Sequence, residues 1–385
     1  MTNDALWRPT DLRACVDLML KARGWPTTAE PERLGAMVRA LSVSYNEHGV
    51  AVQGGGHAAR LGFFLARDIP KSAWALRDLV RGGVWARGGE IDLKVLDLGA
   101  GMGATTFGLL QCLQAYGIRG RVRATLVDAD SVALAIAADL GRRLRWDGIA
   151  LELSTSVGDA HAYKASSHVD VVLMGQVLSE LDQSGAPEDR ARVHALSLAQ
   201  RLQSSVRDSG TLCIVEPALK DRTRHLHAVR DAMLGDGRAT VYAPCLHTAP
   251  CPALAREEDW CHDDVLVDLP DWLVPTARAA GLRYQGLTLA YLLLRKDGRR
   301  LRDAIAGEGV GRATSAVIAS KGKTEVVLCG DARSGEQRGR LRLLDRDQTS
   351  ENAPWLSLKH GDLVRFEGEL PERSRLSKKT LVIVQ

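Results

Sequence analysis

The chain of 385 residues is 45% hydrophobic and 25% charged, and its 51 Lys and Arg against 47 Asp and Glu give a formal net charge of +4. These values are those of a soluble globular protein large enough for two or three domains. They exclude a protein that spans a membrane by helices, because no run of 18 apolar residues occurs. The N-terminus carries early acidic residues and neither a signal nor a transit pattern, so we expect a cytoplasmic monomer that does not bind membranes.

Residues 1–90 are predicted to be mainly helical. The stretches 32–48 and 57–80 repeat apolar residues at three- and four-residue spacing, and a GGG break at 54–56 separates them. We interpret these residues as an N-terminal helical region.

Residues 91–300 predict an α/β domain. Short apolar runs at 91–98, 121–128, 151–157, 168–175 and 210–216 alternate with helical patterns, of which 104–117 and 131–144 are the clearest. Such alternation is typical of βαβ units, so we expect a largely parallel, doubly wound, Rossmann-like sheet. A Cys-rich insertion at about 240–270 falls where a sixth strand is due, and residues 282–297 regain a two-residue alternation that can close the sheet.

Residues 305–385 predict a second, smaller domain. Five short strand-like runs are separated by turns rich in Gly, Lys and Arg, a pattern that favours a small β-barrel of OB-like type. From Arg295 to the end about 19 Lys and Arg face about 13 Asp and Glu, so this part carries the positive excess. That asymmetry suits a polyanionic partner such as RNA.

The first predicted strand ends in a glycine loop. In VLDLGAGMGA the spacing is D-x-G-x-G-x-G, formed by Asp97, Gly99, Gly101 and Gly103 with Ala100 between the first two glycines. Dinucleotide-binding loops run G-x-G-x-x-G, with the third glycine one residue later. The form found here resembles that of class I S-adenosylmethionine-dependent methyltransferases, in which the loop wraps the methionine end of the ligand.

The later strands of the domain end in residues that suit the same ligand. Asp128 ends the second strand, where a carboxylate can accept hydrogen bonds from both ribose hydroxyls. Asp159, followed by Ala160, ends the third and resembles the acid that recognises the adenine amino group, whereas Asp130 is interpreted as the N-cap of the next helix. Gln176 follows the fourth strand and completes the predicted cofactor-binding set.

No catalytic residue is evident at the ends of the fourth and fifth strands. They read MGQVLSELD and VEPALKD, with neither the Pro-Pro-aromatic motif of base-amine methyltransferases nor a nucleophilic cysteine at the strand end. Gln176 and Glu216 are candidates for contact with ligand or substrate only. The sequence therefore predicts cofactor binding more firmly than methyl transfer.

Three of the seven cysteines lie in YAPCLHTAPCPALAREEDWCHDD, as Cys245, Cys251 and Cys261. Clustered cysteines in a reducing compartment suggest metal ligands, and both structural zinc and iron–sulfur clusters accept four thiolates. Among the remaining cysteines, Cys329 in VVLCGD is the best candidate for the fourth. His247 and His262 are possible replacement ligands.

These features together resemble one family, the mitochondrial small-ribosomal-subunit methyltransferase-like assembly proteins and their bacterial relatives, or Rsm-twenty-two family. The similarity lies in VLDLGAGMG, VLSEL, IVEP, APC-x5-C, WCH and the late strand cysteine, and runs from about Leu34 to the C-terminus. It implies a 4Fe-4S cluster held by Cys245, Cys251, Cys261 and Cys329, with zinc as the alternative. It also implies association with the small ribosomal subunit during assembly.

We therefore expect an S-adenosylmethionine-binding, iron–sulfur-containing methyltransferase-like protein that acts on the small ribosomal subunit or its rRNA. The alternatives are a non-catalytic assembly and RNA-binding factor, or a small-molecule methyltransferase with a structural zinc site. Arg222, Arg224 and Arg230, near the insertion, are interpreted as contacts to RNA phosphates together with the basic C-terminal part.

Overall fold

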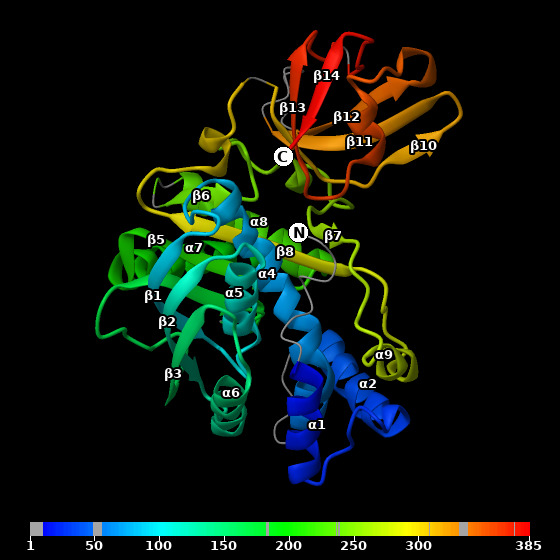
Figure 1. The fold of residues 1–385 in the computed structure, drawn as a ribbon. Coiled ribbons are helices and arrows are strands. Elements are labelled where there is room, and N and C mark those ends of the chain that lie inside the picture. The colour runs from blue at the N-terminus through cyan, green and yellow to red at the C-terminus, as the bar shows by residue number, and fades with distance from the viewer. Residues whose placement is uncertain are drawn as a thin grey trace.

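The computed structural model describes residues 11–48, 56–181, 185–235, 237, 239–307, 309–330, 338–372 and 374–385. These residues form an N-terminal group of helices, a central α/β unit and a C-terminal β unit (Figure 1). Within them, every helix is too short or too polar to traverse a lipid bilayer.

The N-terminal part is helical, as predicted, in the residues that the structure describes; the GGG break at 54–56 falls mostly outside them. Its second helix packs on α9 of the central unit, where Arg39 donates to the carbonyls of Ala279 and Ala280. The last helix runs from this group along the sheet toward the C-terminal unit (Figure 1). The elements are α1 (Leu12–Ala22), α2 (Pro31–His48), α3 (His57–Ala59), the π-helical turn η2 (Arg60–Phe64) and α4 (Leu65–Arg81).

The central sheet has the strand order β3-β2-β1-β4-β5-β8-β6, with β7 paired to β8. Strands β1 to β5 are parallel, whereas β8 runs antiparallel to β5, β6 and β7, so the sheet is mixed rather than largely parallel. The strands are β1 (Glu90–Leu98), β2 (Arg119–Asp128), β3 (Ile149–Val157), β4 (Val169–Gly175), β5 (Val206–Glu216), β6 (Thr240–Ala243), β7 (Asp263–Val265) and β8 (Leu287–Arg295).

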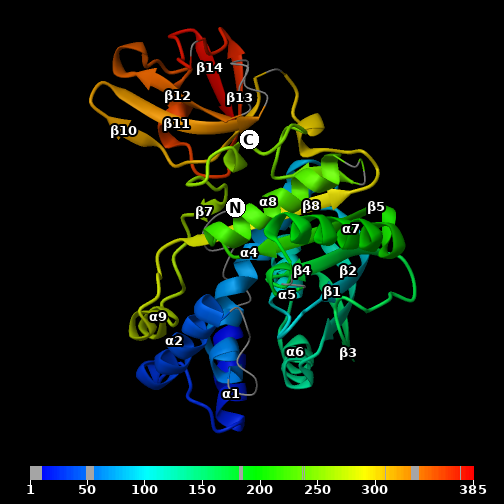
Figure 2. The same ribbon diagram turned by 180° about the vertical axis from the view of Figure 1, so that it is seen from behind.

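Helices cover both faces of this sheet, which explains why its inner strands read as continuous apolar runs. One buried apolar cluster includes residues of α4, α5 and α6, and a second includes residues of α7 and α8 on the opposite face (Figure 2). The helices are α5 (Ala104–Ala115), α6 (Ser131–Arg143), α7 (Pro187–Ser205), α8 (Lys220–Gly235) and α9 (Val274–Ala280), with 3-10 turns η3 (Leu178–Glu180) and η4 (Pro252–Leu254). The Rossmann-like α/β fold is thus confirmed.

The insertion begins one step later than predicted. The sequence placed it where a sixth strand was due, but β6 forms first and is followed at once by Pro244 and Cys245. Proline lacks the N–H that would continue the ladder, so the strand stops after four residues. The strand predicted to close the sheet is β8. It lies between β5 and β6, so it is an internal strand and β6 forms the edge.

The C-terminal unit is an antiparallel sheet with the order β10-β11-β9-β13-β14 and β12 on the other side of β11. It has its own apolar core, centred on Trp355 and Phe366. No ladder closes the sheet between β12 and β14 in the described residues, so the OB-like barrel stays a prediction. The elements are β9 (Gly311–Ala313), β10 (Ile318–Ser320), β11 (Lys323–Gly330), β12 (Arg338–Leu344), β13 (Leu363–Gly368), β14 (Thr380–Val384) and the 3-10 turns η5 (Leu301–Ala304), η6 (Asp345–Asp347) and η7 (Ala353–Ser357).

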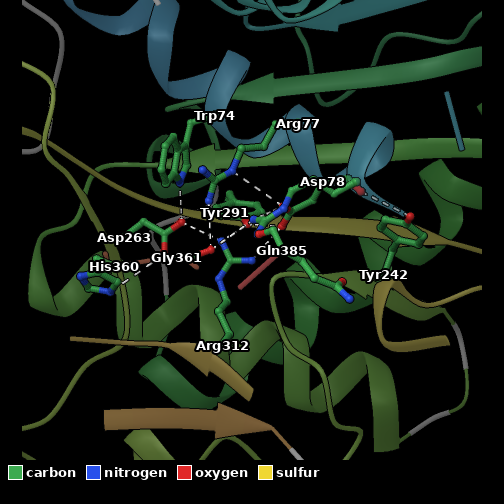
Figure 3. Close-up of polar contacts among 11 residues, drawn as sticks. Trp74, Arg77, Asp78, Tyr242, Asp263, Tyr291, Arg312, His360, Gly361 and Gln385 are labelled. Carbon is green, nitrogen blue, oxygen red and sulfur yellow. Dashed lines mark hydrogen bonds and ion pairs between the residues drawn. The ribbon is translucent and has the colours of Figure 1, made fainter. Parts of the chain in front are cut away.

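A buried guanidinium joins the two units. Arg312 of β9 donates to Asp78 of α4 at 2.9 Å, to Asp263 of β7 at 3.0 Å and to the hydroxyl of Tyr291 of β8 at 2.6 Å (Figure 3). Tyr291 donates in turn to Asp78 at 2.6 Å, and Trp74 donates to Asp263 at 2.6 Å. Burial alone would raise the pKa of Asp263, but the Arg312 guanidinium, helped by His360 and Arg77, lowers it to about 2. We call this set the Arg312 hub.

Backbone carbonyls of the C-terminal unit add to the same contact. Arg77, stacked 3.1 Å above the Trp74 ring, donates to the Gly361 carbonyl at 3.2 Å. Arg81 donates to Gly361 at 3.2 Å and to the Gln385 carbonyl at 2.6 Å. Helix α4 is therefore tied to the C-terminal unit at several points.

Replacing Arg312 by Met removes the cation that the buried carboxylates of Asp78 and Asp263 share. We expect a loss of about 3–5 kcal/mol in the free energy of unfolding, the usual cost of removing one partner of a buried ion pair. Urea denaturation measures it, with Arg340→Met, an exposed position on β12, as the matched control. An Arg312 variant as stable as the control would contradict this account.

Candidate functional site

The glycine loop joins β1 to α5 and needs its glycines. Gly99, Gly101 and Gly103 have φ of +68°, +51° and +85°, in the left-handed region that side chains rarely adopt. A Cβ at Gly101 would lie 2.7 Å from Arg60, and one at Gly99 would lie 2.4 Å from Val177. The loop is thus a cradle of bare backbone at the start of α5.

Asp97, at the end of β1, lies under this loop and is fully buried. One carboxylate oxygen accepts from the backbone N–H of Thr106 at 3.1 Å and from its hydroxyl at 2.7 Å. The other makes no hydrogen bond to the described residues, although it is buried. Burial raises the pKa of Asp97 to about 7 against the lowering effect of the Thr106 bonds.

Asp128 and Asp159 lie beside the loop at the ends of β2 and β3. Asp128 accepts from the Gly101 N–H at 2.7 Å and from the Asp130 N–H at 2.8 Å. The carbonyl of Asp128 accepts from Gly158 at 3.0 Å, which brings Asp159 and the partly buried Ala160 to the same edge. Asp130 caps α6 by accepting from Ala133 at 3.0 Å, as interpreted from the sequence.

Gln176 follows β4 with φ of +59°, a conformation that is rare outside glycine and asparagine. Its N–H donates to the Val215 carbonyl at 2.7 Å, so it lies next to the end of β5, and its side chain hydrogen-bonds Asp68. Strained backbone of this kind gathers at functional sites. The structure therefore brings all the predicted cofactor residues to one edge of the sheet, across the crevice between β1 and β4 where the strand order reverses.

Sequence reasoning missed residues that α3, η2 and α4 bring to this edge. His57 and Arg60 contact Asp130 at 2.7 and 3.0 Å, and Lys71 forms a buried ion pair with Asp68 at 2.8 Å. No spacing in the sequence links them to the glycine loop. The π-helical turn η2, a feature often found at functional sites, is the one local sign, and it is not readable from residue types.

Glu216 ends β5 as a buried acid. It is 1% exposed and accepts from the Leu178 N–H at 3.0 Å. Burial raises its pKa to about 7, opposed by hydrogen bonds from Ser179 and Leu178. A pKa near 7 suits a general base at neutral pH. The carboxylate, however, is already hydrogen-bonded to the first residue of η3.

The four predicted thiol ligands come from two parts of the chain. Cys245 follows β6, Cys251 precedes η4, Cys261 precedes β7 and Cys329 lies in β11. Cys245, Cys261 and Cys329 line one pocket, and Cys329 is 3.4 Å from His247. Burial and the charges of Cys329, Cys245 and Cys251, in that order, raise the pKa of Cys261 well above its usual value, so all four thiols lie close together.

The described residues hold no set of three His, Cys, Asp or Glu side chains arranged to bind a metal ion. The thiols therefore lie near one another, but they are not arranged around the position of a single metal ion. Burial, followed by neighbouring thiols, raises the pKa of Cys251 to about 11 and that of Cys329 to about 12. The free thiols of Cys251 and Cys329 are thus neutral at physiological pH.

Two of the arginines interpreted as RNA contacts hold the insertion. Arg230 is fully buried and donates to the carbonyls of His247 and Ala249, each at 2.8 Å. Arg224 donates to the carbonyls of Ala253 at 3.0 Å and Asp259 at 2.6 Å, among others, and Arg222 donates to a carbonyl of α2. The predicted contact of Arg230 with RNA is wrong, because its side chain is buried against the insertion, whereas the contacts of the partly exposed Arg222 and Arg224 stay predictions.

One family matches this chain over residues 91–333, well over half its length, and is described as "Mitochondrial small ribosomal subunit Rsm22". The chain belongs to this family. The Rsm22 match includes both the glycine loop and all four cysteines of the thiol site. No curated protein matches the sequence.

Two solved structures show distant similarity to this member of the Rsm22 family. A putative class I S-adenosylmethionine-dependent methyltransferase from Listeria monocytogenes is 14% identical over 76% of this chain and 88% of its own, with a TM-score of 0.37. The N-methyltransferase NodS from Bradyrhizobium japonicum WM9, in complex with S-adenosyl-L-homocysteine, is 12% identical over 67% of this chain and 97% of its own, with a TM-score of 0.34. We therefore assign the fold from the strand order of this chain and not from these similarities.

The raised pKa of Asp97 predicts a pH dependence. Unfolded Asp titrates near 3.9 and folded Asp97 near 7, so the native state binds more protons in between and its stability falls as pH rises through that window. Asp97→Asn keeps an acceptor for Thr106 but cannot ionise. Between about pH 5 and about pH 8 we expect the wild type to lose about 1–3 kcal/mol relative to this variant.

Urea denaturation of the ligand-free proteins at both pH values measures this difference. Asp139→Asn, on the partly exposed surface of α6, controls for a generic Asp-to-Asn effect. Parallel pH profiles for wild type and Asp97→Asn would show that Asp97 ionises normally.

Proposed function

We propose that this protein binds S-adenosylmethionine in the crevice between β1 and β4 and acts on the small ribosomal subunit or its rRNA. The observation that carries the proposal is the placement of Asp97 and Asp128 against a glycine cradle, with Asp159 at the next strand end, in a member of the Rsm22 family. One buried oxygen of Asp97 has no hydrogen-bond partner among the described residues and suits a cationic group, and the methionine end of the ligand carries an ammonium.

The division of roles follows the strand ends. Asp128 suits the two ribose hydroxyls and Asp159 suits the adenine amine, while the bare backbone of Gly99–Gly103 leaves room for the methionine chain. When bound, S-adenosylmethionine supplies an activated methyl group. Gln176 and Asp68, hydrogen-bonded at the ends of β4 and α4, form the polar wall on which an acceptor would be oriented.

The ribosomal partner is supported by charge as well as by family. The C-terminal unit exposes a set of basic side chains that suits phosphate contacts, and such contacts need no aromatic stacking. The small OB-like barrel that we propose for this unit is a common carrier of single-stranded RNA. The exposed set comprises Lys321, Arg340, Arg342, Arg346, Lys359, Lys378 and Lys379.

We further propose that Cys245, Cys251, Cys261 and Cys329 hold a 4Fe-4S cluster, with a zinc ion as the alternative. A set of four thiols is the chemistry that both groups prefer, and buried Arg230 lies beside them to offset their charge. Such a centre would supply a covalent link between the insertion and β11.

A non-catalytic assembly role is the second candidate. Glu216, an acid with a near-neutral pKa at the end of β5, is 1% exposed and already accepts from Leu178, so it is poorly placed to take a proton from a large RNA. On this reading the crevice binds the ligand and stabilises the fold without methyl transfer.

Tritiated methyl transfer to isolated small subunits separates the two. We expect wild type to bind S-adenosylmethionine and Gly101→Arg to lose binding, because any side chain there meets Arg60 in a left-handed backbone. Gly83→Ala, at φ of +68° in open space, is the matched control and keeps binding. A wild type that binds S-adenosylmethionine and co-sediments with small subunits, but transfers no label, would establish the assembly role. A wild type that shows neither ligand binding, nor co-sedimentation, nor methyl transfer would refute the proposal.

The metal site has its own test. Cys251→Ser should lose more than about half of its bound iron, or of its zinc, because one of four thiolate ligands is removed. Metal analysis after purification without oxygen measures it, and Cys15→Ser, packed against the N-terminal core, is the control. Equal metal content in the two variants would show that Cys251 is not a metal ligand.

A further inference from the structure

At the end of the insertion, in residues 259–263, every second side chain faces the C-terminal unit. Asp259 contacts Arg338, Cys261 lines the same pocket as Cys329, and Asp263 accepts from Arg312 at 3.0 Å. A two-residue period is that of an extended chain with one side against a partner. The segment 259–263 thus offers an acid, a thiol and an acid in a row.

The C-terminal sheet offers the complementary row. Cys329 of β11 pairs with Arg338 on β12 and with Arg312 on β9. Residues directly opposite in an antiparallel ladder project from the same face, with their Cβ atoms about 5 Å apart. Arg338, Cys329 and Arg312 therefore face the insertion side by side. We call the three contacts Asp259–Arg338, Cys261–Cys329 and Asp263–Arg312 the three-rung contact.

We propose that the two outer ion pairs dock the C-terminal unit on the insertion and set the register in which Cys329 meets Cys261, and that they do so without any bound metal. Asp259, Arg338, Asp263 and Arg312 are then positioning residues for the thiol site. The inference rests on the proposed function only in taking Cys261 and Cys329 as ligands of one centre.

Burial makes these pairs selective. The side chains of Arg312 and Asp263 are 4% and 8% exposed, and those of Arg338 and Asp259 are 16% and 31% exposed. A one-residue slip of an extended segment turns each side chain to the other face and would leave the Arg312 guanidinium buried without a carboxylate. A thiolate–metal bond has no such preference, since any cysteine within reach can serve.

The contact also extends beyond the thiols on one side. Asp263 and Arg312 belong to the Arg312 hub, which adds Asp78 and Tyr291 of the central unit. The Asp263–Arg312 pair therefore holds one end of the contact without a metal, and the Asp259–Arg338 pair holds the other end. Cys329, the fourth proposed ligand, lies between these two pairs.

The first test uses protein that cannot close the thiol site. Cys245→Ser with Cys251→Ser removes two thiols and leaves the three-rung contact intact. We expect trypsin to cut the connection at Arg299, Arg300 and Arg302 within about twofold of the wild-type rate, because cleavage follows the population of the undocked state. Cleavage faster by about tenfold or more would make the metal the clamp and overturn the proposal.

The second test exchanges the charges of the more exposed pair. Asp259→Arg and Arg338→Asp should each speed tryptic cleavage by about tenfold and lose more than about half of the bound metal, since like charges then face each other. The double variant D259R/R338D restores the pair, so both readouts should return to within about twofold of wild type. A double variant that behaves like either single one would refute the pairing.

Two controls keep the outcomes separate. Arg340→Asp, two residues along β12 with its side chain 58% exposed, should leave cleavage and metal unchanged. S-adenosylmethionine binding reports that the central unit of each variant is folded. If the wild type itself carries neither iron nor zinc, the proposed metal centre fails, while the cleavage rates of the exchanged pair still decide the docking.

Discussion

One buried cation constrains how this molecule is put together. Arg312 is 3% exposed and cannot give up its proton, so its charge must be met by carboxylates brought to it. Those carboxylates come from α4 and β7, and the hydroxyl of Tyr291 comes from β8. A single side chain of the C-terminal unit thereby specifies where α4, β7 and β8 must lie. The meeting of the thiols beside it is a consequence of that placement.

Helix α4 carries this constraint to the cofactor crevice. Near its start Asp68 pairs with Lys71 and lies beside Gln176. Farther along the same helix, Trp74 and Asp78 belong to the Arg312 hub. A continuous helix keeps these groups at a fixed separation, so the crevice and the C-terminal unit hold one spatial relation. This geometry suits a protein that presents a ligand site and a basic surface to the same large partner. It requires no movement between the units.

What the sequence could predict follows from the range of the interactions. The repeating units of β1 to β5 and the D-x-G-x-G-x-G loop depend on local periodicity and on glycine backbone freedom, and both were read correctly. The place of β8 depends on pairing with β5 and β6, which no local pattern encodes. Arg224 and Arg230 look the same in sequence whether they face RNA or a neighbouring loop. His57 and Arg60 reach Asp130 only through the path of η2, a turn that residue types do not reveal.

The insertion itself shows how a segment poor in apolar residues can be ordered before a metal is considered. Its carbonyls at Ala253, Leu254, Arg256 and Asp259 converge on the guanidinium of Arg224, and those at His247 and Ala249 converge on Arg230. Asp231 accepts the N–H of Cys251 at 2.8 Å. Buried backbone groups need such partners, and here one helix supplies them. Since the loop and the docking pairs are both satisfied by protein groups, a bound centre would complete a prepared site, and its free energy would go into joining the two units more than into folding the loop.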